Sequence, residues 1–362
     1  MKRKKWILIA LLIIIGITST ILYTHYKIEK KNIEKNTVRL PEGTGIDLDE
    51  ACVGWMEVAY TEERLEKKYL EKVQTICIKS LDESNYKEIA ELIKKMDNLK
   101  VIELEFCEEY TIDMEYISEL GLEKRKISVN ILGYDGRSLQ NLANIKEIEQ
   151  LDIYVDGNST IACNYLANVK KLRVTRGKIT EESGIDTMKS LEWIYLAETT
   201  IEGFGDCFGL NLITKISMFS VEGEDFIGIA NIPNEFELYM EGGNISQMAW
   251  ESLEMAKIKE LSINSMKLES FEFAKKIECL KSLIYKYGRE YVDISALQQL
   301  EKICLSSKTI GQQEADMLSQ LSNIKSISLE GECEIQDYSG LQKLPYLEEF
   351  YINEEKVNIN SK

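Results

Sequence analysis

The chain has 362 residues, and 44 Lys and Arg against 61 Asp and Glu give it a formal net charge of −17 at pH 7. Sequence-independent nucleic-acid binding needs a basic surface, so this acidic balance argues against a nucleic-acid partner. The only histidine is His25, which lies beside an apolar run near the N-terminus. The rest of the chain therefore cannot form a Ser-His-Asp triad, a Cys-His dyad or a His-ligated metal centre. We expect no catalytic residue, no metal and no other cofactor.

The first 26 residues are typical of a membrane anchor. A basic tail, residues 1–5, precedes an uncharged run from Trp6 to Tyr23, which is just long enough to cross a bilayer as a helix. Cations before the span favour keeping the N-terminus inside the cell. We therefore predict a cytoplasmic tail over residues 1–5, a transmembrane signal-anchor helix over residues 6–26 and an extracellular body. The alternative is a cleaved signal peptide, which would make the protein secreted.

Residues 27–60 are expected to connect this anchor to the body. Their lysine-rich beginning, residues 27–36, is typical of a solvated stalk. Residues 41–60 are expected to cover the edge of the first repeat of the body, because arrays of repeats need terminal caps.

The body, residues 61–362, repeats the pattern apolar-x-x-apolar-x-apolar. Its copies lie about 23 residues apart on average, within the range of leucine-rich repeats. The alternating apolar positions predict one short strand per copy, and successive strands are expected to stack as a parallel sheet. The clear copies are LKVIEL (Leu99–Leu104), IEQLDI (Ile148–Ile153), VKKLRV (Val169–Val174), LEWIYL (Leu191–Leu196), ITKISM (Ile213–Met218), IKELSI (Ile258–Ile263), LKSLIY (Leu280–Tyr285), LEKICL (Leu300–Leu305), IKSISL (Ile324–Leu329) and LEEFYI (Leu347–Ile352). Weaker copies are VQTICI (Val73–Ile78), KRKISV (Lys124–Val129) and NEFEL (Asn234–Leu238).

The predicted fold class is α/β: a leucine-rich-repeat solenoid with a parallel concave sheet, preceded by one transmembrane helix. No single copy can bury its apolar face alone, so the copies are expected to fold as one array. Apolar residues at helical spacing also predict helices over Glu62–Val73 and Tyr86–Met96.

Three segments resemble the repeats of bacterial internalin-type leucine-rich-repeat surface proteins: DISALQQLEKICL (Asp293–Leu305), DYSGLQKLPYLEEFYI (Asp337–Ile352) and, more loosely, SLQNLANIKEIEQLDIYV (Ser138–Val155). The resemblance implies a solenoid whose exposed sheet binds another macromolecule, and it leaves the ligand open. The chain departs from that family three residues after each strand. Only Cys107 matches the asparagine or cysteine that the family favours there, so we expect less regular turns.

Side chains that lie between the buried strand positions face the open surface of the sheet. Aromatic residues gather there on neighbouring copies, and rigid rings and arginine dominate the energetics of many interfaces. The alternative is that such rings are simply favoured on strands and pack on one another. The candidate binding residues are Tyr154, Arg173, Trp193, Tyr195, Phe219 and Tyr239.

These observations predict a membrane-anchored extracellular protein that recognises a protein or peptide ligand and catalyses no reaction. Its acidic charge favours a basic partner through the association rate, and a glycan is the second ligand class. Two alternatives stay open. One is a structural scaffold of an envelope complex, and the other is a carboxylate-dependent glycoside hydrolase that would use residues such as Glu103 and Glu105.

The eight cysteines include no CxxC pair. Those on neighbouring copies occupy different places in the repeat: Cys304 faces the open surface, Cys279 precedes its strand and Cys333 follows its strand. We therefore do not expect disulfides between adjacent copies.

Overall fold

The computed structural model describes residues 37–41, 44–47, 64–70, 72–106, 112–120, 125–136, 139–287 and 292–358. The chain divides into unit 1, Met1–Glu103 with Tyr110–Arg125, and unit 2, Leu104–Glu109 with Lys126–Lys362. The predicted tail, transmembrane helix and stalk, residues 1–36, lie outside the described residues. Among the residues that are described, no helix is long and apolar enough to cross a membrane.

Unit 1 contains two antiparallel strand pairs. β1 pairs with β3, and β2 lies along β4, the first strand of the repeats. The continuous helix expected over residues 62–73 is wrong, because residues 64–66 pair as a strand and the helix that follows is short. The elements are β1 (Thr37–Arg39), β2 (Thr44–Asp47), β3 (Arg64–Glu66), α3 (Lys67–Leu70), β4 (Thr75–Ile78), α4 (Tyr86–Lys94), η1 (Met114–Leu120) and the first half of β5 (Val101–Phe106).

The helix expected over residues 86–96 is confirmed as α4. Its Ile89, Leu92 and Ile93 recur at helical spacing and are buried. Tyr86, at the first position of α4, stacks on Tyr116 of η1 with the ring centroids 4.5 Å apart. The amphipathic pattern therefore docks this helix through its apolar side.

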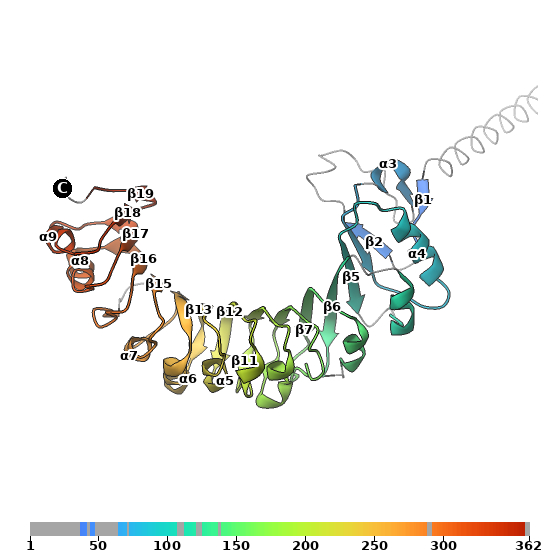
Figure 1. The fold of residues 1–362 in the computed structure, drawn as a ribbon, viewed down its shortest axis with the longest axis horizontal. Helices are drawn as coiled ribbons and strands as arrows, with labels where there is room; N and C mark the ends of the chain where they lie inside the picture. The colour runs from blue at the N-terminus through green and yellow to red at the C-terminus, as the bar shows by residue number, and fades with distance from the viewer. Residues whose placement is uncertain are drawn as a thin grey trace, which may run out of the picture. The chain divides into compact units, whose positions relative to one another are not determined.

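Unit 2 contains a sheet of stacked parallel strands, one per repeat (Figure 1). Equivalent apolar residues lie opposite one another: Leu172, Ile194 and Ile216 share one register and are at most 1% exposed. This register confirms the predicted leucine-rich-repeat fold. The strands are β6 (Lys126–Tyr134), β7 (Gln150–Val155), β8 (Lys171–Thr175), β10 (Trp193–Ala197), β12 (Lys215–Gly223), β13 (Phe236–Ile245), β14 (Ile258–Asn264), β15 (Ser282–Lys286), β16 (Lys302–Ile310), β17 (Ser326–Cys333) and β18 (Glu349–Ile352).

Short helices and turns follow the strands and pack on one side of the sheet of unit 2 (Figure 1). The other side of the strands, called the strand face below, lies at the surface. The α-helices are α5 (Ile227–Ala230), α6 (Gln247–Ser252), α7 (Glu272–Lys275), α8 (Gln312–Leu318) and α9 (Ser339–Gln342). The remaining elements are η2 (Gln140–Asn144), β9 (Lys178–Ile179), η3 (Glu181–Ser183), η4 (Ile185–Thr187), β11 (Thr200–Ile201), η5 (Cys207–Gly209), η6 (Leu253–Met255) and β19 (Glu355–Lys356).

The register predicted for two weak copies is wrong by two residues. In β13 the residue opposite Ile216 is Leu238, not Phe236 as the copy NEFEL predicts, and KRKISV is shifted in the same way in β6. Both strands carry three alternating buried apolar residues, so the pattern allows two registers and the neighbouring strands select one. Because the shift is two residues, Tyr239 stays on the strand face, now opposite Ser217.

A left-handed residue recurs in each of five neighbouring repeats: it directly follows β8, β10 and β14, and it lies within β12 and β13. The amides of two of them, Arg176 and Glu198, donate to carbonyl oxygens of the next repeat at 2.8 and 2.9 Å. The expectation of irregular turns is therefore wrong for these repeats, because the same backbone conformation recurs without asparagine. The left-handed residues, with φ between 51° and 67°, are Arg176, Glu198, Ser220, Gly242 and Ser265.

Side-chain amides that lie before the strand also connect neighbouring repeats. The Nδ2 atoms of Asn168 and Asn323 donate to backbone carbonyls of the preceding repeat at 3.1 and 2.7 Å. Gln299, at the equivalent position, donates in the same way at 2.9 Å. These bonds satisfy carbonyls that the sheet itself does not use.

Four cysteines of unit 2 are free thiols: Cys163, Cys207, Cys279 and Cys304. Cys163 and Cys207 are at most 1% exposed. Burial raises the pKa of each of these two thiols to about 12, so both are protonated and unreactive at neutral pH.

Candidate functional site

The six candidate binding residues come from five neighbouring strands of unit 2. Parallel pairing places Arg173 opposite Tyr195 and Phe219 opposite Ala197. Neighbouring strands lie about 4.8 Å apart, so large side chains on adjacent strands can touch. The structure places Tyr154 in β7, Arg173 in β8, Trp193 and Tyr195 in β10, Phe219 in β12 and Tyr239 in β13.

Four rings form a continuous aromatic ladder: Trp193, Tyr195, Phe219 and Tyr239. The centroids of Tyr195 and Phe219 are 4.9 Å apart with their planes at 28°. Phe219 and Tyr239 follow at 5.1 Å and 37°, and Trp193 meets Tyr195 edge-on at 6.0 Å and 80°. All four side chains are half-buried. The rings therefore pack on one another and also keep part of their area at the surface.

Arg173 closes the β8 end of the ladder. Its Cζ lies 4.7 Å from the ring centroid of Tyr195, which is a cation–π geometry. Within the described part of the chain the guanidinium has no ion pair, and its Nε is buried without a hydrogen-bond partner. The terminal nitrogens of this fixed cation can therefore donate to a ligand.

The β13 end of the ladder carries a carboxylate. The hydroxyl of Tyr239 donates to the carboxylate of Glu241. Burial, followed by this hydrogen bond, raises the pKa of Tyr239 above its ordinary value of 10.0, so the hydroxyl stays protonated at neutral pH. The ladder is also fixed in the middle, because the Nε1 of Trp193 donates to Ser217 Oγ at 3.3 Å.

Tyr154 does not join the ladder. It is 37% exposed, its partner in register is Thr175, and none of the ring contacts among the described residues includes it. Tyr154 lies in β7, as expected, but the structure does not bring it together with the other five candidates.

Asp152, which the alternation pattern places on the open surface, is only 8% exposed. Its two carboxylate oxygens accept from the Nε2 of Gln150 at 3.1 and 3.0 Å. Burial raises the pKa of Asp152, against the hydrogen bond from Gln150 and the charge of Arg173. The alternation of buried and exposed positions along a strand does not show that the side-chain amide of Gln150 covers this carboxylate.

The two carboxylates that flank the ladder are too far apart for glycoside hydrolysis. Asp152 in β7 and Glu241 in β13 are separated by four strand spacings, roughly 19 Å. A glycosidase pair works at about 5–10 Å. Asp152 and Glu241 are therefore not a pair that could act on one glycosidic bond.

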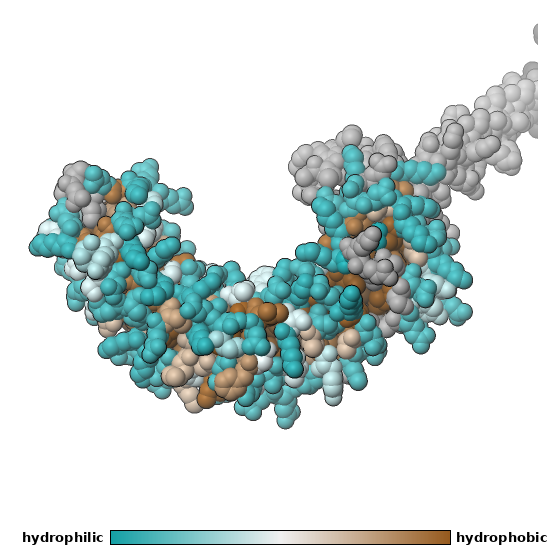
Figure 2. Space-filling view, viewed as in Figure 1, coloured by the Kyte–Doolittle hydropathy of each residue, from teal (hydrophilic) through white to brown (hydrophobic). Residues whose placement is uncertain are grey.

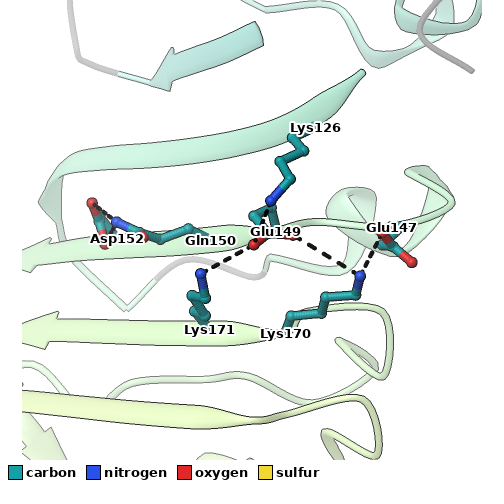
Figure 3. A network of polar contacts seen from close by, with 7 residues as sticks. All are labelled: Lys126, Glu147, Glu149, Gln150, Asp152, Lys170 and Lys171. Carbon is teal, nitrogen blue, oxygen red and sulfur yellow. Dashed lines mark hydrogen bonds and ion pairs between the residues drawn. The ribbon is translucent and has the colours of Figure 1, made fainter. Parts of the chain in front are cut away.

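Sequence analysis missed a second set of side chains, the charged network of Lys126, Glu147, Glu149, Lys170 and Lys171 (Figure 3). Glu149 Oε1 accepts from the Nζ atoms of Lys126 and Lys171 at 3.2 and 3.0 Å. Lys170 lies 3.9 Å from Glu149 and donates to Glu147 at 2.8 Å. The sequence signal that could have revealed this network is the order of charges, positive, negative and positive, at the start of three successive strands.

Burial alone would raise the pKa of Glu149, but the hydrogen bonds and charges of Lys171 and Lys126 outweigh it and lower the pKa. In Figure 3 the lysines converge on Glu149 from both sides, whereas Gln150 reaches along its strand to Asp152.

Figure 2 shows a largely hydrophilic surface, with apolar side chains gathered on the helical side near α5 and α6. Four apolar residues of the helical side, from three repeats, are more than half exposed: Phe208 (62%), Ile227 (59%), Met248 (60%) and Met255 (81%). They lie on the opposite side of the strands from the ladder and provide control positions outside it.

No family model matches the chain, and no curated protein matches it. Among solved structures, an internalin, InlF, from Listeria monocytogenes is 15% identical, with 82% of this chain and 91% of that chain covered and a TM-score of 0.41. Internalin C2 from the same species is 14% identical, with coverages of 80% and 85% and a TM-score of 0.23. The complex of TLR13 with ssRNA13 is 12% identical, with coverages of 74% and 52% and a TM-score of 0.35. The leucine-rich-repeat fold of this chain therefore rests on the strand register described above.

Proposed function

We propose that this protein is a recognition protein whose repeats bind a segment of another protein through the aromatic ladder. The half-buried stack that runs from Arg173 to Tyr239 on the strand face carries the proposal. Rings held in place by one another lose little side-chain entropy when a ligand binds. Aromatic residues and arginine are also enriched where interfaces gain most of their binding energy.

The geometry of the stack favours a protein ligand. Tyr195 and Phe219 cover each other's faces, and the Tyr239 hydroxyl already donates to Glu241, so ring edges, the Tyr195 hydroxyl and the Arg173 cation remain for the ligand. Ring edges suit edge-to-face contacts with aromatic side chains, and the polar groups suit backbone carbonyls. We propose no catalytic role for this surface.

The proposed location rests on the sequence alone. Residues 6–26 would anchor the chain as a transmembrane helix with the repeats outside the cell. Protease treatment of intact cells should then remove the body beyond Asn36 and leave a small membrane-embedded fragment. A body that resists protease while the envelope is freely accessible would reverse this topology.

The binding proposal is tested by selecting linear peptides from a displayed random library on the full-length protein. The selected peptides are then measured against a double variant, Trp193→Ala with Tyr239→Ala. We expect a loss of at least about tenfold in affinity, since two residues at the centre of an interface typically contribute more than 1 kcal/mol each.

Two matched controls locate the effect. Tyr351→Ala removes a tyrosine from the same face of β18, outside the ladder, and Ile227→Ala removes an exposed apolar residue on the helical side. Both should change the affinity by less than about twofold. Peptides that bind the double variant as tightly as the wild type would overturn the proposal.

A further inference from the structure

The two ends of the aromatic ladder carry opposite charges. Arg173 stands at the β8 end and Glu241 at the β13 end, where it accepts the hydrogen bond of Tyr239. The ladder is thus an apolar strip between a cationic and an anionic end.

The cation at the β8 end is not neutralised by an ion pair among the described residues. Asp152 lies opposite Arg173 in register, but both of its oxygens accept from Gln150 instead. Lys171, the other cation of β8, donates to Glu149 and belongs to the charged network. Arg173 is therefore the cation of β8 that a ligand can meet.

The anion at the β13 end also keeps its charge. Glu241 accepts from a neutral hydroxyl, which leaves lone pairs for further donors, and no ion pair within the described ranges includes it. Lys259 pairs with Glu237 at 3.3 Å and so does not compensate Glu241. A cationic group of a ligand would be attracted to this end.

The separation of the two charges sets the spacing of a ligand. From β8 to β13 there are three strand spacings, about 14 Å. The residue of β13 in register with Arg173 is Tyr239, and Glu241 lies two residues farther along the strand, so the two backbone positions are about 16 Å apart. An extended peptide advances about 3.3–3.4 Å per residue, so four residue steps cover about 13–14 Å and the length of the charged side chains spans the remainder. Groups of opposite charge at positions i and i+4 of an extended segment would reach Arg173 and Glu241 together.

We propose, resting on the proposed function, that the ligand is an extended protein segment with an acidic and a basic residue four positions apart and apolar residues between them. The acidic residue contacts Arg173, the apolar residues contact the ladder, and the basic residue contacts Glu241. The net charge of −17 favours a uniformly basic partner, whereas the local charges select a segment that carries both signs.

The test uses a capped nine-residue synthetic peptide with glutamate at its third position, lysine at its seventh and Val-Phe-Val between them. Two companion peptides replace either the glutamate or the lysine by glutamine. Affinities are measured with full-length wild type, Arg173→Met and Glu241→Gln in detergent, which gives a double-mutant cycle for each charge pair.

We expect Arg173→Met to weaken the parent peptide about tenfold, as the loss of a charge-assisted hydrogen bond would. The same substitution should weaken the glutamine-for-glutamate peptide by less than about twofold, although it also removes the contact with Tyr195. Likewise, Glu241→Gln should weaken binding of the parent peptide about tenfold and binding of the glutamine-for-lysine peptide by less than about twofold. A parent peptide with its lysine moved next to the glutamate should bind no better than the neutralised peptides.

Failure of this inference differs from failure of the proposed function. If the three peptides bind equally and Tyr195→Ala still abolishes binding, the charge assignment is overturned and the ladder remains the binding site. If none of them binds the wild type at millimolar concentration while library-selected peptides do bind and lose affinity in the Trp193→Ala, Tyr239→Ala double variant, only this inference is overturned. If all of them bind the double variant as tightly as the wild type, both proposals are overturned.

Discussion

The aromatic ladder and the charged network are built in the same way and differ in what they leave open. Each consists of side chains from neighbouring strands of unit 2. In the charged network Glu149 meets three lysines, and Lys170 also has Glu147 as a partner. In the ladder the rings pack on one another, but neither Arg173 nor Glu241, at its two ends, forms an ion pair with another described residue. A set of side chains whose charges are paired with one another stabilises the contacts between strands. A set whose end charges form no ion pair can also bind a ligand.

The largest effect on stability is expected at the centre of the ladder. Phe219→Ala removes both ring contacts, to Tyr195 and to Tyr239, and should lower the free energy of unfolding by about 2 kcal/mol. This estimate lies below the usual cost for a fully buried ring because Phe219 is half-buried. Urea denaturation followed by circular dichroism measures it. Tyr154→Ala, which removes an aromatic ring without ring contacts, should cost less than about 0.5 kcal/mol; equal losses would mean that the stack contributes nothing beyond area.

A smaller effect is expected in the charged network. Glu149→Gln removes the negative charge shared by Lys126 and Lys171 and should cost about 1 kcal/mol, because Glu149 is only 17% exposed. The loss should shrink in 1 M NaCl as screening weakens the lost attraction. Glu198→Gln breaks an exposed pair with Arg176 and should change stability by less than about 0.3 kcal/mol. A salt-independent loss at Glu149 would contradict an ionic origin.

The smallest effect is a difference in pH dependence between two neighbouring carboxyls. The pKa of Glu149 is lowered from 4.5, so its contribution is present above pH 4.5 and is lost as the pH falls through the lower folded-state pKa. The pKa of Asp152 is raised from 3.8, so its ionisation destabilises the fold as the pH rises through the higher folded-state pKa.

Stability curves between pH 3 and pH 7 should separate these two contributions. Relative to Glu149→Gln the wild type should gain stability with rising pH, and relative to Asp152→Asn it should lose stability. Each change should stay within about 1 kcal/mol. Curves of the same sign for both pairs would show that burial of Asp152 is offset by its partners.

Much of the fold follows from the spacing of apolar residues alone. Every predicted copy coincides with a strand, because alternate residues such as Leu172 and Val174 must be buried against neighbouring repeats. The failures occur where the pattern is degenerate. In β6 the apolar residues Ile127, Val129 and Ile131 alternate, and only pairing with β7 decides that Val129 faces Leu151.

The aromatic content of the site was predictable, and its polar surroundings were not. Trp193, Tyr195, Phe219 and Tyr239 stand out because large rings recur at one face of successive copies. The cover that Gln150 gives Asp152 depends on side-chain conformation, which alternation does not encode. The amide contacts of Asn168 were also missed, since the family pattern directs attention to the turn after the strand rather than to the residues before it.

The direction of the backbone hydrogen bonds gives unit 2 a particular response to force. In a parallel sheet these bonds run from strand to strand, which here is along the stack of repeats. Tension applied between the first and last strands of the unit loads these bonds in series, so one repeat opens at a time. Strands then peel away singly at low force, whereas a sheet pulled along its strands must shear many bonds at once. Under tension the unit should therefore lengthen one repeat at a time.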